Sequence, residues 1–90
     1  MASNKYRKKP VVIEAFQINK ETPVKDAPEW LMKAFDSGDA KINEQGLGVD
    51  LKTLEGVMLG SWGDWIIQGV KGEIYSCRDD IFQATYEPAE

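Results

Sequence analysis

The chain has 90 residues, of which 42% are hydrophobic and 29% charged, with a net charge of −4 and no histidine. This composition is typical of one small globular domain and excludes a chain that is disordered by composition. No apolar run approaches the roughly 20 residues that a membrane-spanning helix needs, so the sequence predicts no membrane-embedded segment. We expect a single domain over residues 1–90, with a flexible tail at 87–90.

Charge is distributed unevenly along the chain. Lys5, Arg7, Lys8 and Lys9 crowd the first nine residues, and all 15 acidic residues follow them. We interpret residues 1–9 as a basic, flexible arm that keeps the chain end in solvent, or that contacts phosphate or anionic lipid. The acidic remainder argues against binding to nucleic acid, because neutralising phosphates supplies most non-specific affinity.

The residues that usually carry catalysis are scarce. Without histidine, serine and cysteine triads lack their usual base, and a zinc site would have only Cys77 and carboxylates as ligands. A single cysteine forms no internal disulfide, and no apolar signal segment follows Met1, which together predict an intracellular location. We therefore expect no enzyme, no metal site and no cofactor.

One helix is expected early in the chain, after a first strand. Residues 10–18 are rich in β-branched and aromatic side chains with apolar groups on both faces, which predicts a central or sandwiched strand. A polar loop follows, and Asp26 or Ala27 then caps a helix over about 27–36, with Pro28 in its first turn and Gly38 at its end. Four apolar side chains recur at helical spacing along it, namely Trp30, Leu31, Ala34 and Phe35.

Short strands separated by glycine-bearing turns are expected from residue 40 onward. The pattern predicts strands at 40–43, 49–52, 57–59, 65–68, 73–77 and 84–86, and a single helical turn at 79–82. The segments 65–68 and 73–77 form a hairpin. The fold class is therefore α+β, with one helix packed on a curved antiparallel sheet, or an SH3-like barrel, of about six or seven short strands.

Two segments carry a family resemblance. Residues 5–17, KYRKKPVVIEAFQ, and residues 63–73, GDWIIQGVKGE, followed by ATYEP at 84–88, resemble small uncharacterised proteins encoded by bacteriophages and prophages. The second segment is also similar to the PGDYG-motif domain, with Trp62, Trp65 and Ile66 in place of that motif's proline, tyrosine and last glycine. The resemblance implies a phage origin and a life in the cytoplasm of the bacterial host. It implies no activity, so no functional residue is transferred.

Four carboxylates form the candidate acidic cluster: Asp64, Glu73, Asp79 and Asp80. Paired carboxylates can hold Mg²⁺ or shift each other's pKa. We interpret them instead as structural, because Asp64 stands in a glycine-bounded turn and Asp79 and Asp80 stand where a helical turn needs a cap.

Aromatic side chains are the more interesting candidates for binding. Trp62 lies among glycines, so it is either an exposed anchor for a partner or a cover over the open end of a barrel. Tyr75 shares a strand face with Cys77, which we interpret as a buried, unreactive thiol. The candidate binding residues are Trp62, Asp64, Trp65, Lys71, Tyr75 and Arg78.

Three functions are compatible with these observations. The first is a non-catalytic phage accessory protein that binds a host or phage protein, or itself. The second is a protein that binds or sequesters a nucleotide-like signal of host defence, with Trp62 or Trp65 stacking and Lys71 or Arg78 on phosphate. The third is an enzyme that depends on the acidic cluster and a metal ion.

Overall fold

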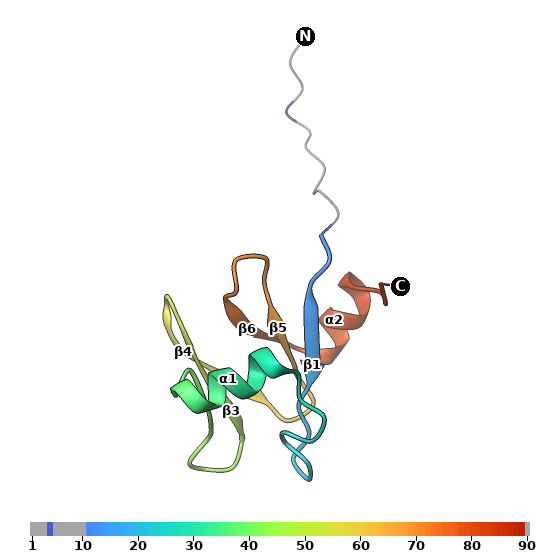
Figure 1. Ribbon diagram of the computed structural model, residues 1–90. Helices are drawn as coiled ribbons and strands as arrows, with labels where there is room; N and C mark the ends of the chain where they lie inside the picture. The colour runs from blue at the N-terminus through green and yellow to red at the C-terminus, as the bar shows by residue number, and fades with distance from the viewer. Residues whose placement is uncertain (1–3, 5–10, 90) are drawn as a thin grey trace.

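In the part of the chain that the structure describes, the fold consists of two three-stranded antiparallel sheets and two helices (Figure 1). The computed structural model describes residues 4 and 11–89. Its elements are β1 (Glu14–Gln17), α1 (Glu29–Ser37), β2 (Ala40–Ile42), β3 (Gly48–Thr53), β4 (Gly56–Ser61), β5 (Trp65–Gln68), β6 (Ile74–Cys77) and α2 (Asp79–Thr85). The α+β prediction is confirmed, but the strands do not close into a barrel. The predicted basic arm at 1–9 lies almost wholly outside the described residues.

Sheet A has the order β1-β5-β6, so β5 is its central strand. The predicted hairpin is confirmed, with Trp65 opposite Cys77 and Gln68 opposite Ile74. The first strand was predicted to be central or sandwiched, and this is wrong, because β1 lies at the edge and none of its residues is buried. The reason is burial: Ile66 and Ile67, neighbours on β5, are both fully buried, whereas every residue of β1 is exposed or half-buried.

Sheet B has the order β2-β3-β4 and follows the chain as a meander. On its central strand, Val49 and Leu51 are fully buried and alternate with Asp50 and Lys52, as expected for a half-buried strand. Strand β4 is exposed along most of its length, and only Gly60 is buried.

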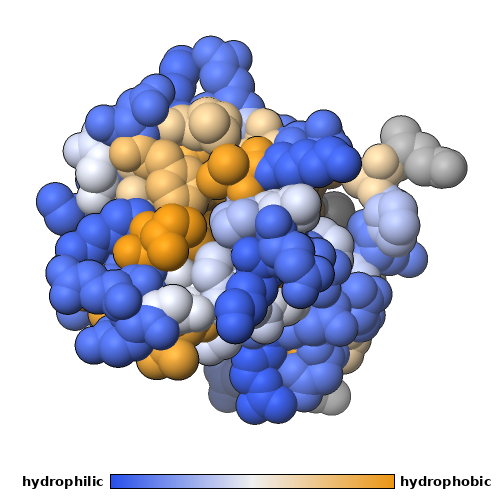
Figure 2. Space-filling model, turned by 90° about the horizontal axis from the view of Figure 1, so that it is seen from below, coloured by the Kyte–Doolittle hydropathy of each residue, from blue (hydrophilic) through white to orange (hydrophobic). Residues whose placement is uncertain are grey.

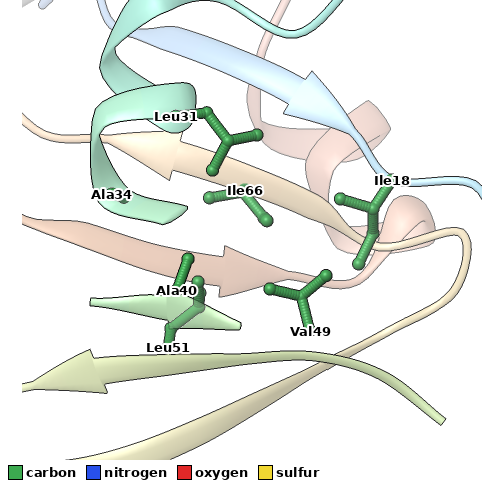
Figure 3. Packing of buried hydrophobic residues seen from close by; sticks show 7 residues of the cluster. All are labelled: Ile18, Leu31, Ala34, Ala40, Val49, Leu51 and Ile66. Atoms are coloured by element: carbon green, nitrogen blue, oxygen red, sulfur yellow. The ribbon is translucent and has the colours of Figure 1, made fainter. Parts of the chain in front are cut away.

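The core lies between the two sheets and α1 (Figure 3). The seven buried residues that form it are Ile18, Leu31, Ala34, Ala40, Val49, Leu51 and Ile66. Leu31 and Ala34 come from one face of α1, as its apolar spacing predicts. Each large side chain in this cluster contributes about 1.5–3 kcal/mol by leaving water. A helix of nine residues has little stability alone, so this contact is what holds α1 in place.

The helix α1 begins later than predicted. Pro28 is its N-cap residue, in an extended conformation, and no side chain caps the helix. Neither Asp26, which has a positive φ of 61°, nor Ala27 caps the helix as predicted, because both precede the N-cap residue. The C-terminal end is as expected, because Gly38 adopts the left-handed conformation (φ 87°) and donates its N–H to Phe35.

A second helix replaces the predicted last strand. The helical turn expected at 79–82 continues to Thr85, so residues 84–86 do not form a strand, and the sheets contain six strands. Phe82 and Tyr86 lie one helical turn apart and their rings stack at 5.0 Å. This spacing of four residues is helical, and the expectation of a strand overlooked it.

Glycines allow β3, β4 and β6 to approach closely. A Cβ on Gly48 would collide with the carbonyl oxygen of Gly60 on the neighbouring strand. A Cβ on Gly60 would lie 3.2 Å from the Cβ of Ser76, which is where β6 of sheet A crosses sheet B. The close approach of β3 to β4 therefore requires glycine at 48, and the close approach of sheet B to β6 requires a small residue at 60.

We predict that Gly48→Ala destabilises the protein far more than Gly46→Ala does. Gly46 also has a positive φ (73°), but a Cβ there meets nothing within 4 Å. The control variant should lose only about 1 kcal/mol of the free energy of unfolding, from backbone strain. Gly48→Ala should lose about 2–4 kcal/mol, because the strands must separate. Equal losses in urea denaturation would contradict the role assigned to this contact.

Candidate functional site

The candidate functional site lies where α2 packs against sheet A. Side chains alternate across a sheet, and Ile66 points to the core, so Trp65, Ile67 and Tyr75 share the opposite face with Ala15. We call this the outer face of sheet A. Helix α2 follows β6 directly, because Arg78 is both the residue after the strand and the N-cap of the helix. The chain therefore folds back onto the outer face at once.

Trp65 fixes α2 to the sheet. Its ring stacks on Phe82 with the centroids 4.1 Å apart and the planes within 8° of parallel. Its indole Nε1–H donates a hydrogen bond of 2.8 Å to Oδ1 of Asp79. Tyr86 continues the stack beyond Phe82. One side chain thus contacts both the start and the middle of the helix, which makes Trp65 a structural residue as well as a candidate for binding.

Asp79 collects several hydrogen bonds on one oxygen. Besides Trp65, the side-chain amides of Gln83 (3.2 Å) and Gln17 (3.5 Å) donate to its Oδ1. The bonds from Trp65 and Gln83 hold the pKa of the Asp79 carboxyl below its ordinary value. Arg78 or Asp79 was predicted near the cap of this helical turn, and Arg78 is the N-cap residue with Asp79 next to it, but no side chain caps the helix and the Asp79 carboxylate bonds to Trp65 of the sheet.

An open groove of about 1000 Å³ lies beside this contact, between α2 and the outer face of sheet A. Its walls are mostly apolar or aromatic, with contributions from Ala15 of β1 and from the segment that precedes it. The lining residues are Val11, Val12, Ile13, Ala15, Trp65, Gly69, Val70, Glu73, Tyr75, Phe82, Gln83, Thr85, Tyr86, Glu87, Pro88 and Ala89. Two of these are acidic, and none is basic.

Tyr75 and Cys77 lie on the same face of β6, as predicted. Burial, together with interaction with Tyr86, raises the pKa of Tyr75 to about 12. Burial also raises the pKa of the Cys77 thiol, with smaller contributions from Asp64 and Asp80. The thiol is half-buried, and its raised pKa makes it a poor nucleophile.

Trp62 lies elsewhere, between the core and the loop that joins β2 to β3. Its indole Nε1–H donates to the carbonyl of Gly46 (2.7 Å) and its backbone N–H to the carbonyl of Leu47 (3.4 Å). The side chain is half-buried and packs on the core. The sequence left two roles open for Trp62, an exposed anchor for a partner or a cover over the end of a barrel. This arrangement matches a cover, although the described strands form no barrel. It also separates Trp62 from the groove.

The four acidic residues do not converge. Asp64 accepts the Ser61 N–H (3.0 Å) in the turn role predicted for it, and Glu73 accepts the Lys71 N–H (3.1 Å). Asp80 forms an exposed ion pair with Arg78 at 2.9 Å. Within residues 4 and 11–89, no group of three or more acidic or cysteine side chains is placed to hold a metal ion.

The predicted binding residues therefore separate into two groups. Trp65 and Tyr75 meet in the groove, whereas Trp62, Asp64, Lys71 and Arg78 do not line it. Phe82 and Tyr86, which complete the aromatic wall, were not among the predicted binding residues. Their spacing of four residues, after two acidic residues that suit the start of a helix, was the available signal.

Comparisons with protein-family models, with curated proteins and with solved structures found no match. The phage resemblance therefore stays a prediction. In the described part of the chain, neither helix is long and apolar enough to cross a membrane.

We predict that Asp79 couples the docking of α2 to pH. The pKa of this carboxyl is lowered in the folded protein, so its contribution to stability is complete above its ordinary pKa of about 3.9 and is lost as the pH falls through the folded value. Asp79→Asn should therefore reduce the loss of stability between about pH 5 and about pH 3, measured by urea denaturation with tryptophan fluorescence. Asp36→Asn, at an exposed position on α1, is the control and should leave that loss unchanged. An unchanged loss in Asp79→Asn would contradict the coupling.

We predict that one tyrosine ionises at a pH well above the ordinary pKa of a tyrosine. The chain has three tyrosines, and Tyr75 has its pKa raised to about 12 by burial and by Tyr86. Because the folded value is raised, the contribution of Tyr75 to stability is full below its ordinary pKa of about 10 and is lost as the pH rises towards the folded value. An absorbance titration of tyrosinate should show a late step that Tyr75→Phe removes. A late step that survives the substitution would assign it to another tyrosine.

Proposed function

We propose that the protein is a non-catalytic binding module whose groove beside α2 accepts an extended segment of a partner protein, one with apolar side chains flanked by basic ones. The observation that carries this proposal is the open, aromatic-walled groove of about 1000 Å³. Tryptophan and tyrosine are the residues that most often dominate the energy of protein interfaces. Trp65 of β5, Tyr75 of β6 and Tyr86 at the end of α2 supply them here.

The edge strand β1 offers hydrogen bonds to such a segment. Ile18 donates its N–H to Asp64 and accepts from Gly63, so its backbone groups face the β5 side. Successive residues of an antiparallel strand direct their backbone groups to opposite sides, so the N–H and C=O groups of Ala15 and Gln17 point away from β5. They have no backbone partner within residues 4 and 11–89. A partner strand could pair with this edge and lay side chains into the groove, which Ala15 lines.

Charge favours a basic protein segment over a phosphorylated ligand. Glu73 and Glu87 are the charged residues of the groove lining, and the whole chain has a net charge of −4. Lys71 and Arg78, the cations that a nucleotide would need, are absent from the lining, and Arg78 is paired with Asp80. A phosphate in the groove would therefore meet like charge.

The biological setting of this proposal comes from the family resemblance. A phage or prophage accessory protein would act in the cytoplasm of the bacterial host, and its partner would be a host or phage protein. The accessory role needs no catalytic group.

We predict that the groove prefers a basic apolar peptide and that Val70→Lys weakens its binding. Val70 lines the groove and is 72% exposed, so the substitution adds repulsive charge without disturbing the core. A fluorescent peptide of about eight alternating valines and threonines flanked by lysines should bind, and its dissociation constant should rise about tenfold in the variant, as for loss of about 1–2 kcal/mol at an interface.

Two controls sharpen this test, which is read by fluorescence anisotropy. Ile81→Lys places the same charge on an exposed part of α2 outside the groove lining and should leave binding unchanged. The same peptide flanked by glutamates should bind more weakly to the unsubstituted protein. The proposal fails if the lysine-flanked peptide does not bind, or if Val70→Lys and Ile81→Lys bind it equally.

A further inference from the structure

We propose that β4 is the pairing edge of a two-fold dimer, in which two copies of the chain join their β4 strands in antiparallel fashion. Sheet B of each copy would then be half of one continuous six-stranded sheet, since β4 lies at the edge of a three-stranded sheet. The interface lies on a different sheet from the groove beside α2, so the dimer stands independently of the function proposed above.

The bonding pattern of sheet B determines which backbone groups of β4 are open. Beyond the end of β4, Trp62 donates its N–H to Leu47, so the backbone of Trp62 faces the β3 side. Along an antiparallel strand, successive residues direct their backbone N–H and C=O groups to opposite sides, and the β3–β4 register contains no break. The N–H and C=O groups of Met58 therefore also face β3. Those of Val57 and Leu59 point away from it.

The outward groups of Val57 and Leu59 have no backbone partner among residues 4 and 11–89. Ser61, the next outward residue, is already satisfied. Its N–H donates to Oδ2 of Asp64 at 3.0 Å, and its carbonyl accepts the Asp64 N–H at 2.9 Å. The open part of the edge thus consists of two N–H donors and two C=O acceptors. They belong to Val57 and Leu59, between which Met58 lies.

A second copy fits these four groups in one symmetric register. When Val57 lies opposite Leu59 of the second copy, the two-fold axis places Leu59 opposite Val57 of the second copy. Each such pair exchanges two hydrogen bonds, so every open group finds a partner, and the bonds of Ser61 are kept. Met58 then faces Met58 of the second copy. In a register that places Val57 opposite Val57 of the second copy, Leu59 would not lie opposite a residue with open backbone groups.

The side chains of β4 suit burial in such an interface. The strand, GVMLGS, contains no charge and no proline, although natural edge strands are usually protected by one or the other. Val57 is 70% exposed, and Met58 and Leu59 are each 39% exposed. Seen from below, apolar groups gather on the side of the molecule that sheet B occupies in Figure 1 (Figure 2).

The charges of β3 favour this symmetric arrangement. Lys52 lies opposite Val57 and Asp50 opposite Leu59 within one copy. In the proposed register, Lys52 and Val57 of one copy lie in the same row as Leu59 and Asp50 of the other. The β3 strands therefore place opposite charges, Lys52 and Asp50, on the two sides of the β4–β4 junction, although each chain carries a net charge of −4.

The test is the mass of the full chain in solution, measured by sedimentation equilibrium over a range of concentrations. The unsubstituted protein should follow a monomer–dimer equilibrium. Val57→Lys should raise its dissociation constant about tenfold or more, because a charge on an edge strand opposes edge-to-edge pairing. Leu59→Pro should do the same by removing an outward N–H that β3 does not use.

Ile81→Lys is the matched control, since it adds the same charge at an exposed apolar residue of α2, and it should leave the dimer unchanged. Circular dichroism establishes that each variant is folded, and Val57→Lys should still bind the lysine-flanked peptide if the groove proposal holds. A protein that stays monomeric at every concentration would overturn the dimer. So would a dimer that Val57→Lys and Leu59→Pro leave as tight as Ile81→Lys does.

Discussion

Strand β5 has to be covered on both of its faces, and the rest of the structure follows from this constraint. Ile66 and Ile67 are adjacent, point in opposite directions and are both fully buried. One cover consists of α1 and sheet B, whose apolar residues enclose Ile66. Such a cover needs two sheets that approach closely, which is why a small residue is required at 60, where β4 meets β6.

The other face of β5 is covered more lightly. A helix of seven residues is too short to be stable alone, and it has no side-chain cap and no fully buried residue of its own. Its attachment depends on Trp65, which stacks on Phe82 and bonds to Asp79. Because so short a helix cannot span the outer face of sheet A, part of that face stays open beside it. The groove is thus a consequence of how β5 is covered.

Local patterns in the sequence were sufficient for most elements and insufficient for their arrangement. Alternation along 49–52, the glycine-bounded hairpin and Gly38 as a helix end are local signals, and the structure confirms them. The position of β1 at an edge depends on which strand finds cover on both faces, which no single segment reveals. The hydrogen bond between Trp65 and Asp79 was not predicted for the same reason: the two residues are 14 positions apart and become neighbours only when α2 folds back.

The candidate interaction sites follow from the edges of the sheets more directly than from any motif. Strand β2 has only three residues, and the outward Ser76 N–H of β6 contacts Sδ of Met58 at 3.3 Å, so these edges offer little to a partner. The edges of β1 and β4 remain. The edge of β1 borders an acidic, aromatic groove and so favours a different chain that is basic. The edge of β4 is uncharged, and its open backbone groups are arranged symmetrically, so it favours a second copy of the same chain. Two edges with such different surroundings can be occupied at once, because they belong to separate sheets.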